Sequence, residues 1–444
     1  MTKKRYIDSP AYDDAFHKVR PQLAGAGLAA LDQARLTALE RFMQDGLPGP
    51  RVEEWKYCNL TRLADRPYLP IPRETVEAAQ LSEDVLKDEP FGGRLVFVNG
   101  YFVQNLSRLP QIEGIEVKAL SELKNDEKSA GYMNELVEAD DGDSLLALNQ
   151  ALFSDGMILR LGAGVELAEP LEILHLADRS AEGKARRSRN LIHLEKGAKA
   201  TVVEKYAGAA ACFYWTQDVS RIVLEEDARL ISYSLQQEGE KAVHMARKNV
   251  ELAAGARYEN HSLQLGAELS RTEIFPRLLG EGAKVVLKGA YMGREGQSHD
   301  IFTRMDHVSG HCDSEQVFRG VLDTGGKGAF QGRVIVERDA QKTNADQSCK
   351  NLLLSRQAEA NAKPELLIYA DDVKCSHGAT VGELDKMALF YLQSRGLSLE
   401  EAKALLVQAF IAEIFEEIEE TAVREEFIAY AEDWLDQAGQ KVTS

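Results

Sequence analysis

The segments Ile222-Val-Leu-Glu-Glu-Asp-Ala-Arg229 and Val250-Glu-Leu-Ala-Ala-Gly-Ala-Arg257 repeat one pattern, in which a short apolar strand ends at a small dipeptide, Asp-Ala or Gly-Ala. In the centre of the chain the Ala of this dipeptide stands at residues 198, 228, 256 and 283, which are 30, 28 and 27 residues apart. Gly and Asp tolerate the positive φ of a tight corner, and Ala is small enough to let successive corners stack. The full set of such dipeptides is Gly162-Ala163, Gly197-Ala198, Asp227-Ala228, Gly255-Ala256, Gly282-Ala283 and Asp339-Ala340.

The segments between these corners have the alternation of half-buried strands, as in Ala200-Thr-Val-Val-Glu-Lys-Tyr206. A repeat of about 30 residues cannot bury its apolar face alone, so neighbouring repeats must stack on one another. The pattern therefore predicts a β-solenoid core over residues 151–385. A β-sandwich or meander with hairpin turns is the alternative that the residues themselves leave open.

The chain on either side of this core has a different texture. Residues 1–90 are predicted to form a mainly helical amino-terminal domain, with Leu31, Leu36, Leu39 and Phe42 near one helical stripe, and residues 91–150 a connecting α/β segment that begins with a buried strand over 94–100. Residues 386–444 are predicted to form a carboxyl-terminal helical domain.

The carboxyl-terminal helices begin with a capping box, Ser398-Leu-Glu-Glu401, in which the Ser hydroxyl and the Glu carboxylate satisfy backbone donors. The apolar stripe that follows has more surface than one packing face requires, which indicates a partner site. Its residues are Ala402, Leu405, Leu406, Ala409, Ile414 and Ile418, with Ile411 and Phe415 beside them.

The 444 residues include 71 acidic and 53 basic ones, and the net charge of −18 disfavours nucleic acid and anionic membranes as partners. The chain starts without a secretory signal and has no apolar run long enough to cross a membrane. Its five cysteines are scattered and odd in number, which indicates free thiols and a cytoplasmic location.

The strongest local chemistry lies in Tyr369-Ala-Asp-Asp-Val-Lys-Cys-Ser-His-Gly378. If this segment is extended, Cys375 and His377 point to the same face, and Lys374 is expected to favour the Cys375 thiolate. A thiolate and an imidazole suit iron, zinc or an iron–sulfur cluster, but two ligands do not complete a site. By chemistry alone, an incidental pair remains the competing interpretation.

The other motifs give weaker evidence of a functional site. His307, His311 and Cys312 resemble metal ligands, but Gly310 and the surrounding turn residues favour a solenoid corner over a metal site. The chain lacks G-x-x-x-x-G-K-[ST], so it is not expected to hydrolyse ATP, and it carries no complete catalytic set.

Four blocks of the sequence follow one another in a characteristic order and spacing. They are Phe330–Gln347, Asn351–Ser355, Lys363–Gly382 and Phe390–Gly396, with the weaker Arg51–Tyr57 near the amino terminus. In this order and spacing they resemble the SufB/SufD family of iron–sulfur cluster assembly proteins. Leu392 stands where the SufB branch carries a cysteine, and the Lys-Cys-Ser-His-Gly block of the SufD branch is present. The resemblance is therefore to the SufD branch.

This resemblance implies a right-handed parallel β-helix flanked by helical domains and a non-catalytic scaffold role. It implies pairing with a SufB-like sister subunit and docking of a SufC-like ABC ATPase on the carboxyl-terminal helices. By the same resemblance His377, with Cys375 beside it, contributes ligands for iron or a transient cluster shared with the sister subunit. The residues assigned to ATPase docking are Leu405, Leu406, Phe410, Ile414 and Phe415.

Three alternatives stay open at this point. The first is that the isolated chain forms a homodimer in place of pairing with its sister subunit. The second is that the chain is the SufB-like central scaffold that receives sulfur, although Leu392 is evidence against this. The third is that the chain is a solenoid enzyme acting on polysaccharide, for which Asp300, Asp306 and Asp313 are the available carboxylates.

Overall fold

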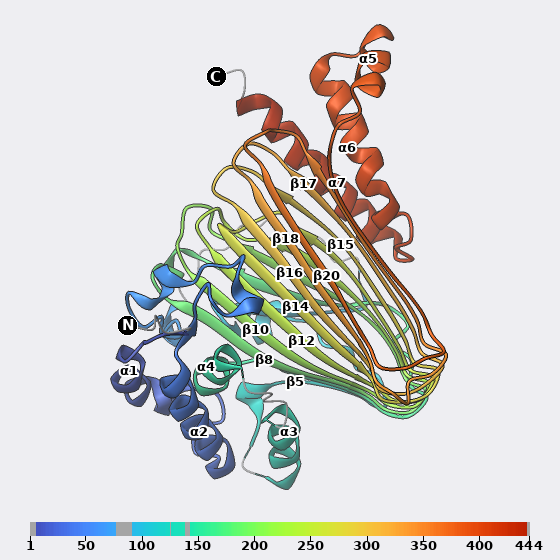
Figure 1. Cartoon of the computed structure of the whole chain (residues 1–444). Coiled ribbons are helices and arrows are strands. Elements are labelled where there is room, and N and C mark those ends of the chain that lie inside the picture. Colours follow the sequence, from blue (N-terminus) through green and yellow to red (C-terminus); the bar gives the residue numbers. More distant parts are fainter. Residues whose placement is uncertain (1–5, 77–90, 125, 138–142, 442–444) are drawn as a thin grey trace.

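The computed structural model describes residues 6–76, 91–124, 126–137 and 143–441, so residues 77–90 of the predicted amino-terminal domain lie outside it. The core is a β-solenoid whose coils stack along one axis, with the early coils beside the amino-terminal helices and the last coils beside the carboxyl-terminal ones (Figure 1). Its strands pair in parallel with the strands of the next coil, so the alternative of hairpin-linked strands is wrong.

Two sheets form the walls of the solenoid. The ten-stranded sheet contains, from first to last, β4 (Tyr101–Phe102), β3 (Gly93–Val98), β7 (Leu171–Ala177), β9 (Lys199–Gly208), β11 (Arg229–Gln237), β13 (Arg257–Gln264), β15 (Lys284–Gly293), β17 (Asp313–Leu322), β19 (Asn344–Leu353) and β21 (Lys374–Glu383). The nine-stranded sheet contains β5 (Ile115–Ala119), β6 (Met157–Leu161), β8 (Ala185–Leu194), β10 (Trp215–Leu224), β12 (Val243–Leu252), β14 (Leu269–Leu278), β16 (Ser298–His307), β18 (Lys327–Val336) and β20 (Glu359–Ile368).

The central corners have the predicted geometry. Gly197, Asp227, Gly255 and Gly282 have positive φ values of 68°, 58°, 67° and 74°. The Ala that follows each of them is fully buried, which places a column of small side chains along one edge of the core. At the two outer corners the positive φ falls elsewhere, at Gly164 and Lys342 rather than Gly162 and Asp339.

One corner has the same geometry but is built from different residues. His311 has a φ of 57° and is exposed, so it takes the place of the corner Gly, and Cys312 is buried in the core where the other corners have Ala. The sequence search for Gly-Ala or Asp-Ala does not find this corner. The interpretation of these residues as a solenoid corner is confirmed.

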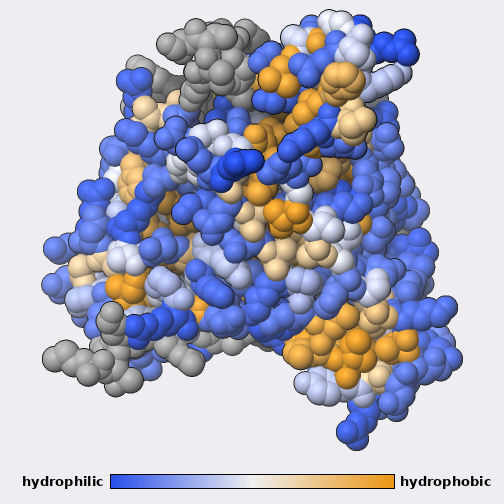
Figure 2. All heavy atoms as spheres, turned by 45° about the horizontal axis from the view of Figure 1, so that its top comes forward, coloured by the Kyte–Doolittle hydropathy of each residue, from blue (hydrophilic) through white to orange (hydrophobic). Residues whose placement is uncertain are grey.

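The two ends of the stack are built differently. At the first end, short strands close both sheets in antiparallel fashion, β5 against β6 and β4 against β3. At the last end, β20 and β21 are edge strands, and none of their residues is buried. Figure 2, in which the top of Figure 1 comes forward, shows apolar side chains gathered in patches on the face in view.

Helices from both parts of the chain outside the core pack against the walls of the solenoid. The amino-terminal part contains α1 (Ala11–Val19), α2 (Ala29–Asp45) and the short antiparallel pair β1 (Tyr6–Ile7) and β2 (Leu47–Pro48), followed in the chain by α3 (Glu127–Val137) and α4 (Ser144–Leu152). The helix predicted around Leu31–Phe42 and the strand predicted at 94–100 are confirmed by α2 and β3.

The carboxyl-terminal helices are α5 (Lys386–Ser394), α6 (Leu399–Phe415) and α7 (Thr421–Lys441). The predicted capping box is present, since the Ser398 Oγ accepts a hydrogen bond from the Glu401 amide and the Glu401 carboxylate accepts one from the Ser398 amide. The predicted apolar stripe is wrong in part, because Leu405 and Ala409 are exposed. The face of α6 that packs on the ten-stranded sheet carries Val407, Ile411, Ile414 and Phe415 instead.

Two corners provide a matched test of this architecture. Replacing Gly255 with Ala should lower the free energy of unfolding by about 1–2 kcal/mol, because an L-residue is strained at positive φ and its Cβ would overlap the Asp227 carboxylate. Replacing Asp227 with Gly, at the same position of the neighbouring corner, should change it by less than about 0.5 kcal/mol. Urea denaturation of both variants measures the difference, and equal stabilities would contradict this account of the corners.

Candidate functional site

Cys375 and His377 lie on β21, the last strand of the ten-stranded sheet, and their parity on the strand gives them the same face, as predicted. Parallel register pairs Cys375 with Ala345 and His377 with Gln347, which are both buried on the interior side of β19. Cys375 is half-buried against the apolar core, and His377 is exposed. The pair therefore faces the mouth of the solenoid at its open end.

The pair by itself does not make a metal site. Within the described parts of the chain, no group of three or more His, Cys, Asp or Glu side chains is arranged to hold a metal ion. Iron and zinc in protein sites take about four ligands or more, so a metal site built on this pair would need two further donors.

The Cys375 thiol is not activated in this structure. Burial raises its pKa above the ordinary value, and the neighbouring Asp346 carboxylate raises it further. The expectation that Lys374 favours the thiolate is wrong, because Lys374 is an exposed residue whose side chain leaves the opposite face of the strand. The Cys375 thiol is therefore mostly protonated at neutral pH, and a metal ion that bound its sulfur would displace the proton.

The second predicted cluster is dispersed. His307 is buried, and its Nε2 lies 2.8 Å from the Ser314 Oγ, while His311 is on the surface 3.8 Å from a Glu281 carboxylate oxygen. The Cys312 Sγ donates to the Gly280 carbonyl at 3.3 Å. These three side chains have separate environments and form no metal site.

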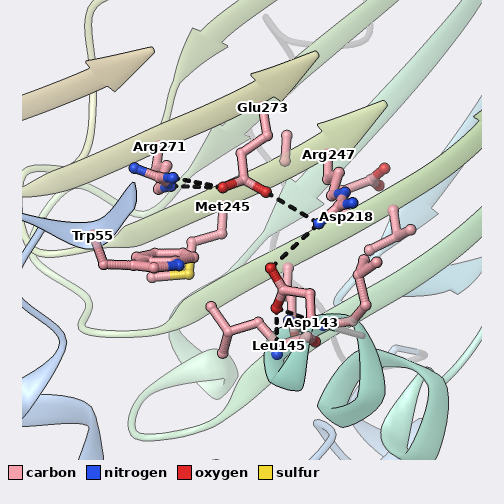
Figure 3. Close-up of a pocket in the computed structure, with 12 residues that line it drawn as sticks. Trp55, Asp143, Leu145, Asp218, Met245, Arg247, Arg271 and Glu273 are labelled. Carbon is pink, nitrogen blue, oxygen red and sulfur yellow. Dashed lines mark hydrogen bonds and ion pairs between the residues drawn. The ribbon is translucent and has the colours of Figure 1, made fainter. Parts of the chain in front are cut away.

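A pocket lies between the amino-terminal segment and the outer face of the nine-stranded sheet (Figure 3). The guanidinium of Arg271 stacks over Trp55 at 4.0 Å, and its Nη2 lies 2.7 Å from a carboxylate oxygen of Glu273. Arg247 bridges Glu273 and Asp143 at 3.7 and 3.2 Å. Because its cations are paired with carboxylates of the same chain, the pocket serves to attach the amino-terminal segment to the solenoid.

The carboxylates of the polysaccharide-enzyme alternative are likewise engaged. Asp300 is buried in an ion pair with Arg271, Asp306 accepts from the Arg304 Nε at 3.0 Å, and Asp313 lies 2.7 Å from the Lys284 Nζ. They also belong to different sheets, since Asp300 and Asp306 are on β16 and Asp313 is on β17. The structure gives this alternative no support.

The interior holds titratable side chains that the sequence analysis did not single out. Lys248 and Glu204 form a buried ion pair, and the His244 Nδ1 lies 2.6 Å from the Glu238 carboxylate. Burial, with the Glu204 carboxylate second, raises the pKa of Asp218. These groups satisfy one another across the two walls and so explain how a charged interior is compatible with a stable core.

The residues assigned to ATPase docking divide into two sets. Ile414 and Phe415 are 1% and 2% exposed in the chain's own core, so they are not available to a partner without unpacking α6. Leu405 is 45% exposed, and Leu406 and Phe410 are half-buried. The helix α5 adds exposed Met387, Phe390 and Tyr391, which the sequence analysis missed because it concentrated on the stripe of the longer helix.

Two family models match the chain. The SufBD core domain of the SUF system of iron–sulfur cluster assembly matches residues 176–410, which contain most of the solenoid and the Cys375–His377 pair. The SufBD protein amino-terminal region matches residues 8–173. The chain therefore belongs to the SufBD family of iron–sulfur cluster assembly proteins.

Individual relatives place the chain more closely. The iron-sulfur cluster assembly protein SufD of Escherichia coli is 30% identical over 393 residues, 88% of this chain and 90% of that protein. A SufBD family protein of Synechocystis is 30% identical and is matched over 90% of both chains, and the chloroplastic protein ABCI7 of Arabidopsis thaliana is 28% identical over 89% and 84%. The chain is thus a SufD-like member of the family, as its sequence motifs predicted. Among its described helices, none has the length and apolar character needed to span a membrane.

The reactivity of Cys375 tests the electrostatics of the site. It is the one cysteine that is not buried, so iodoacetamide should label it alone in the folded chain, slowly at pH 7.5 and faster as the pH rises. Asp346→Asn removes a carboxylate that raises the thiol pKa, so more thiolate forms at a given pH and the rate should rise about threefold. Mass spectrometry of tryptic peptides follows the rate. A slower reaction in Asp346→Asn would refute the electrostatic explanation.

Proposed function

We propose that this chain is a non-catalytic scaffold subunit of the SUF iron–sulfur cluster assembly complex. It pairs through its open solenoid end with a SufB-like sister subunit and offers His377 and Cys375 as ligands for iron or the nascent cluster at the shared interface. The observation that carries this proposal is the coincidence of an incomplete ligand pair with an uncapped sheet edge on the same strand.

The open edge has hydrogen-bonding groups directed outward. The Lys374 amide donates to the carbonyl of Thr343, the residue before β19, and successive amides of a strand point in opposite directions within the sheet. The amides of Cys375, His377 and Ala379 are therefore directed away from β19, toward the open side. A strand of a second subunit added there would satisfy them and would lie directly beside the ligand pair.

Apolar surface supports the same partner site. At the end of β20, Leu367 and Ile368 are 42% and 40% exposed, and on β21 Val381 is 49% exposed. Large apolar side chains on an edge strand invite association, and a long uncapped edge without a partner is prone to aggregation. An obligate sister subunit explains why this end of the stack has no cap of its own.

The carboxyl-terminal helices are suited to dock a SufC-like ATPase. Met387, Phe390 and Tyr391 on α5 are 74%, 68% and 57% exposed, and Leu405 continues this surface on α6. Figure 1 shows α5 and one end of α6 projecting away from the strands. The docking surface is therefore on α5 and the start of α6, while the far end of α6 anchors the pair to the solenoid.

That anchor offers a route for force. Arg319 of β17 is buried and its Nη2 lies 2.5 Å from Glu413 of α6, and buried Lys288 of β15 forms an ion pair with Glu417. Both basic residues are on the ten-stranded sheet that also carries β21. ATP-driven movement of docked ATPase subunits would pull on this sheet and shift the edge that holds His377 and Cys375.

Loss of the His377 imidazole should abolish cluster formation without unfolding the chain. His377→Ala removes an exposed side chain, so the urea midpoint should stay unchanged, whereas iron and sulfide bound to the anaerobically reconstituted complex should fall at least tenfold. His311→Ala, at an exposed corner far along the sequence, is the control. Full cluster loading of the His377→Ala complex would remove the ligand role.

The edge can be tested separately. Ala379→Pro deletes an outward-directed amide but no donor to β19, so the monomer should stay folded while affinity for the sister subunit drops at least tenfold. Ala379→Val keeps the amide and should bind normally. Analytical ultracentrifugation of mixed subunits compares the two. Undiminished pairing of the proline variant would show that the interface lies elsewhere.

A further inference from the structure

The polar side chains behind His377 form a column inside the ten-stranded sheet. Parallel register pairs Gln316 of β17 with Gln347 of β19, and Gln347 with His377 of β21. Neighbouring strands lie about 4.8 Å apart, so each side chain of this column is within reach of the next. The column leads from the closed interior to the imidazole at the open end.

The two glutamines of this column differ in their hydrogen bonds. The Gln316 Oε1 accepts a hydrogen bond from the Thr303 Oγ1 at 2.6 Å, which ties this amide to the opposite wall. Gln347 is 3% exposed, and neither its Oε1 nor its Nε2 has a hydrogen-bond partner among the residues that the structure describes. A buried amide without a partner lowers the free energy of unfolding by about 1–3 kcal/mol, so a glutamine at this position needs an explanation.

The sheet opposite Gln347 has a glycine that leaves space for its side chain. Gly332 of β18 faces the amide, and a Cβ at that position would overlap the Gln347 Nε2. The side chain thus crosses the interior in a space that a larger residue at 332 would fill. Its amide lies one strand below His377, the polar residue that follows it in the column.

We propose that Gln347 is the positioning residue of His377. In the structure this amide points toward Gly332 and has no hydrogen-bond partner in the described part of the chain. When it turns toward β21, its Oε1 would accept the N–H of one imidazole nitrogen, which would fix the tautomer and the ring orientation and leave the lone pair of the other nitrogen for iron. Histidine ligands commonly donate their second ring N–H to an acceptor of this kind, and the acceptor decides which nitrogen binds the metal. This inference rests on the proposed ligand role of His377.

The identity of residue 347 fits this role. A carboxylate at this depth would stabilise the doubly protonated imidazolium, which has no lone pair to give to iron. An apolar side chain would leave the ring free to adopt either tautomer. A neutral amide accepts the hydrogen bond while the imidazole remains neutral, and its buried position keeps water from competing for the amide oxygen.

The imidazole tautomer gives a readout that is independent of cluster assembly. We suggest ¹⁵N solid-state NMR of the sedimented chain with ¹⁵N-labelled histidine, at a pH where the imidazole is neutral, with the His377 signals identified by their loss in His377→Ala. The native chain should show one His377 tautomer. Gln347→Met, which keeps the length and removes the acceptor, should show both, and Gln347→Asn, whose amide is one methylene short, should do the same.

Gln331→Met is the matched control, because Gln331 is an equally buried glutamine on β18 whose Nε2 donates to the Glu54 carbonyl at 3.1 Å on the outer face. It should leave the His377 tautomer unchanged. Identical tautomer populations in the native chain and in a folded Gln347 variant would overturn the positioning role.

The same variants separate this inference from the function on which it rests. On the reconstituted complex, Gln347→Met should weaken iron binding about tenfold, less than His377→Ala does. If Gln347→Met changes the tautomer but His377→Ala leaves cluster loading intact, the ligand proposal fails and the hydrogen bond stands. If His377→Ala abolishes loading but Gln347→Met alters neither tautomer nor iron binding, the positioning role alone fails.

Discussion

Every coil of this protein depends on the coil before it for its backbone hydrogen bonds. In a hairpin sheet a strand finds its partner within a few residues, but here each strand pairs with one about 30 residues away, through continuous parallel register. Stacking satisfies both sides of each inner strand and leaves the problem of backbone pairing to the two ends. At the first end the chain adds the short antiparallel strands β4 and β5 as edges, whereas at the last end the ten-residue strands β20 and β21 are the edges.

The interior and the outer faces of the solenoid are stabilised by different contacts. The corner side of the interior is apolar, while the other part holds pairs such as Lys248 with Glu204, which the rigid register keeps in contact. On the outer faces, arginine and lysine side chains pair with the flanking helices and segments, as Arg271 does beneath Trp55 and Arg319 beneath α6. The flanking parts are thus joined to the walls by desolvated charges as well as by apolar contact, and a force on α6 reaches the ten-stranded sheet directly.

The solenoid can be predicted from the sequence because its corners need residues of a particular kind. Gly or Asp followed by Ala recurs in the sequence at most of these corners. The corner at His311-Cys312 lacks this dipeptide and is indicated only by Gly310 and the turn residues around it, since positive φ and a small buried side chain are the requirements and other residues can meet them. The same limit applies to the site. The spacing of Cys375 and His377 fixes their common face, but the raised pKa of the Cys375 thiol depends on burial and on Asp346 from another coil. Likewise Gln347 is 30 residues from His377 in the chain, so only the register reveals them as neighbours.

The difference between the two ends of the stack bears on how many chains could join. A solenoid with long open edges at both ends would add subunits without stopping and grow into a filament, as uncapped β-structures do. In this chain the edge strands at the last end, β20 and β21, have ten residues each, whereas β4 and β5 at the first end have only two and five. If a sister subunit pairs at the last end as proposed, the short antiparallel strands at the first end offer little template for a third chain.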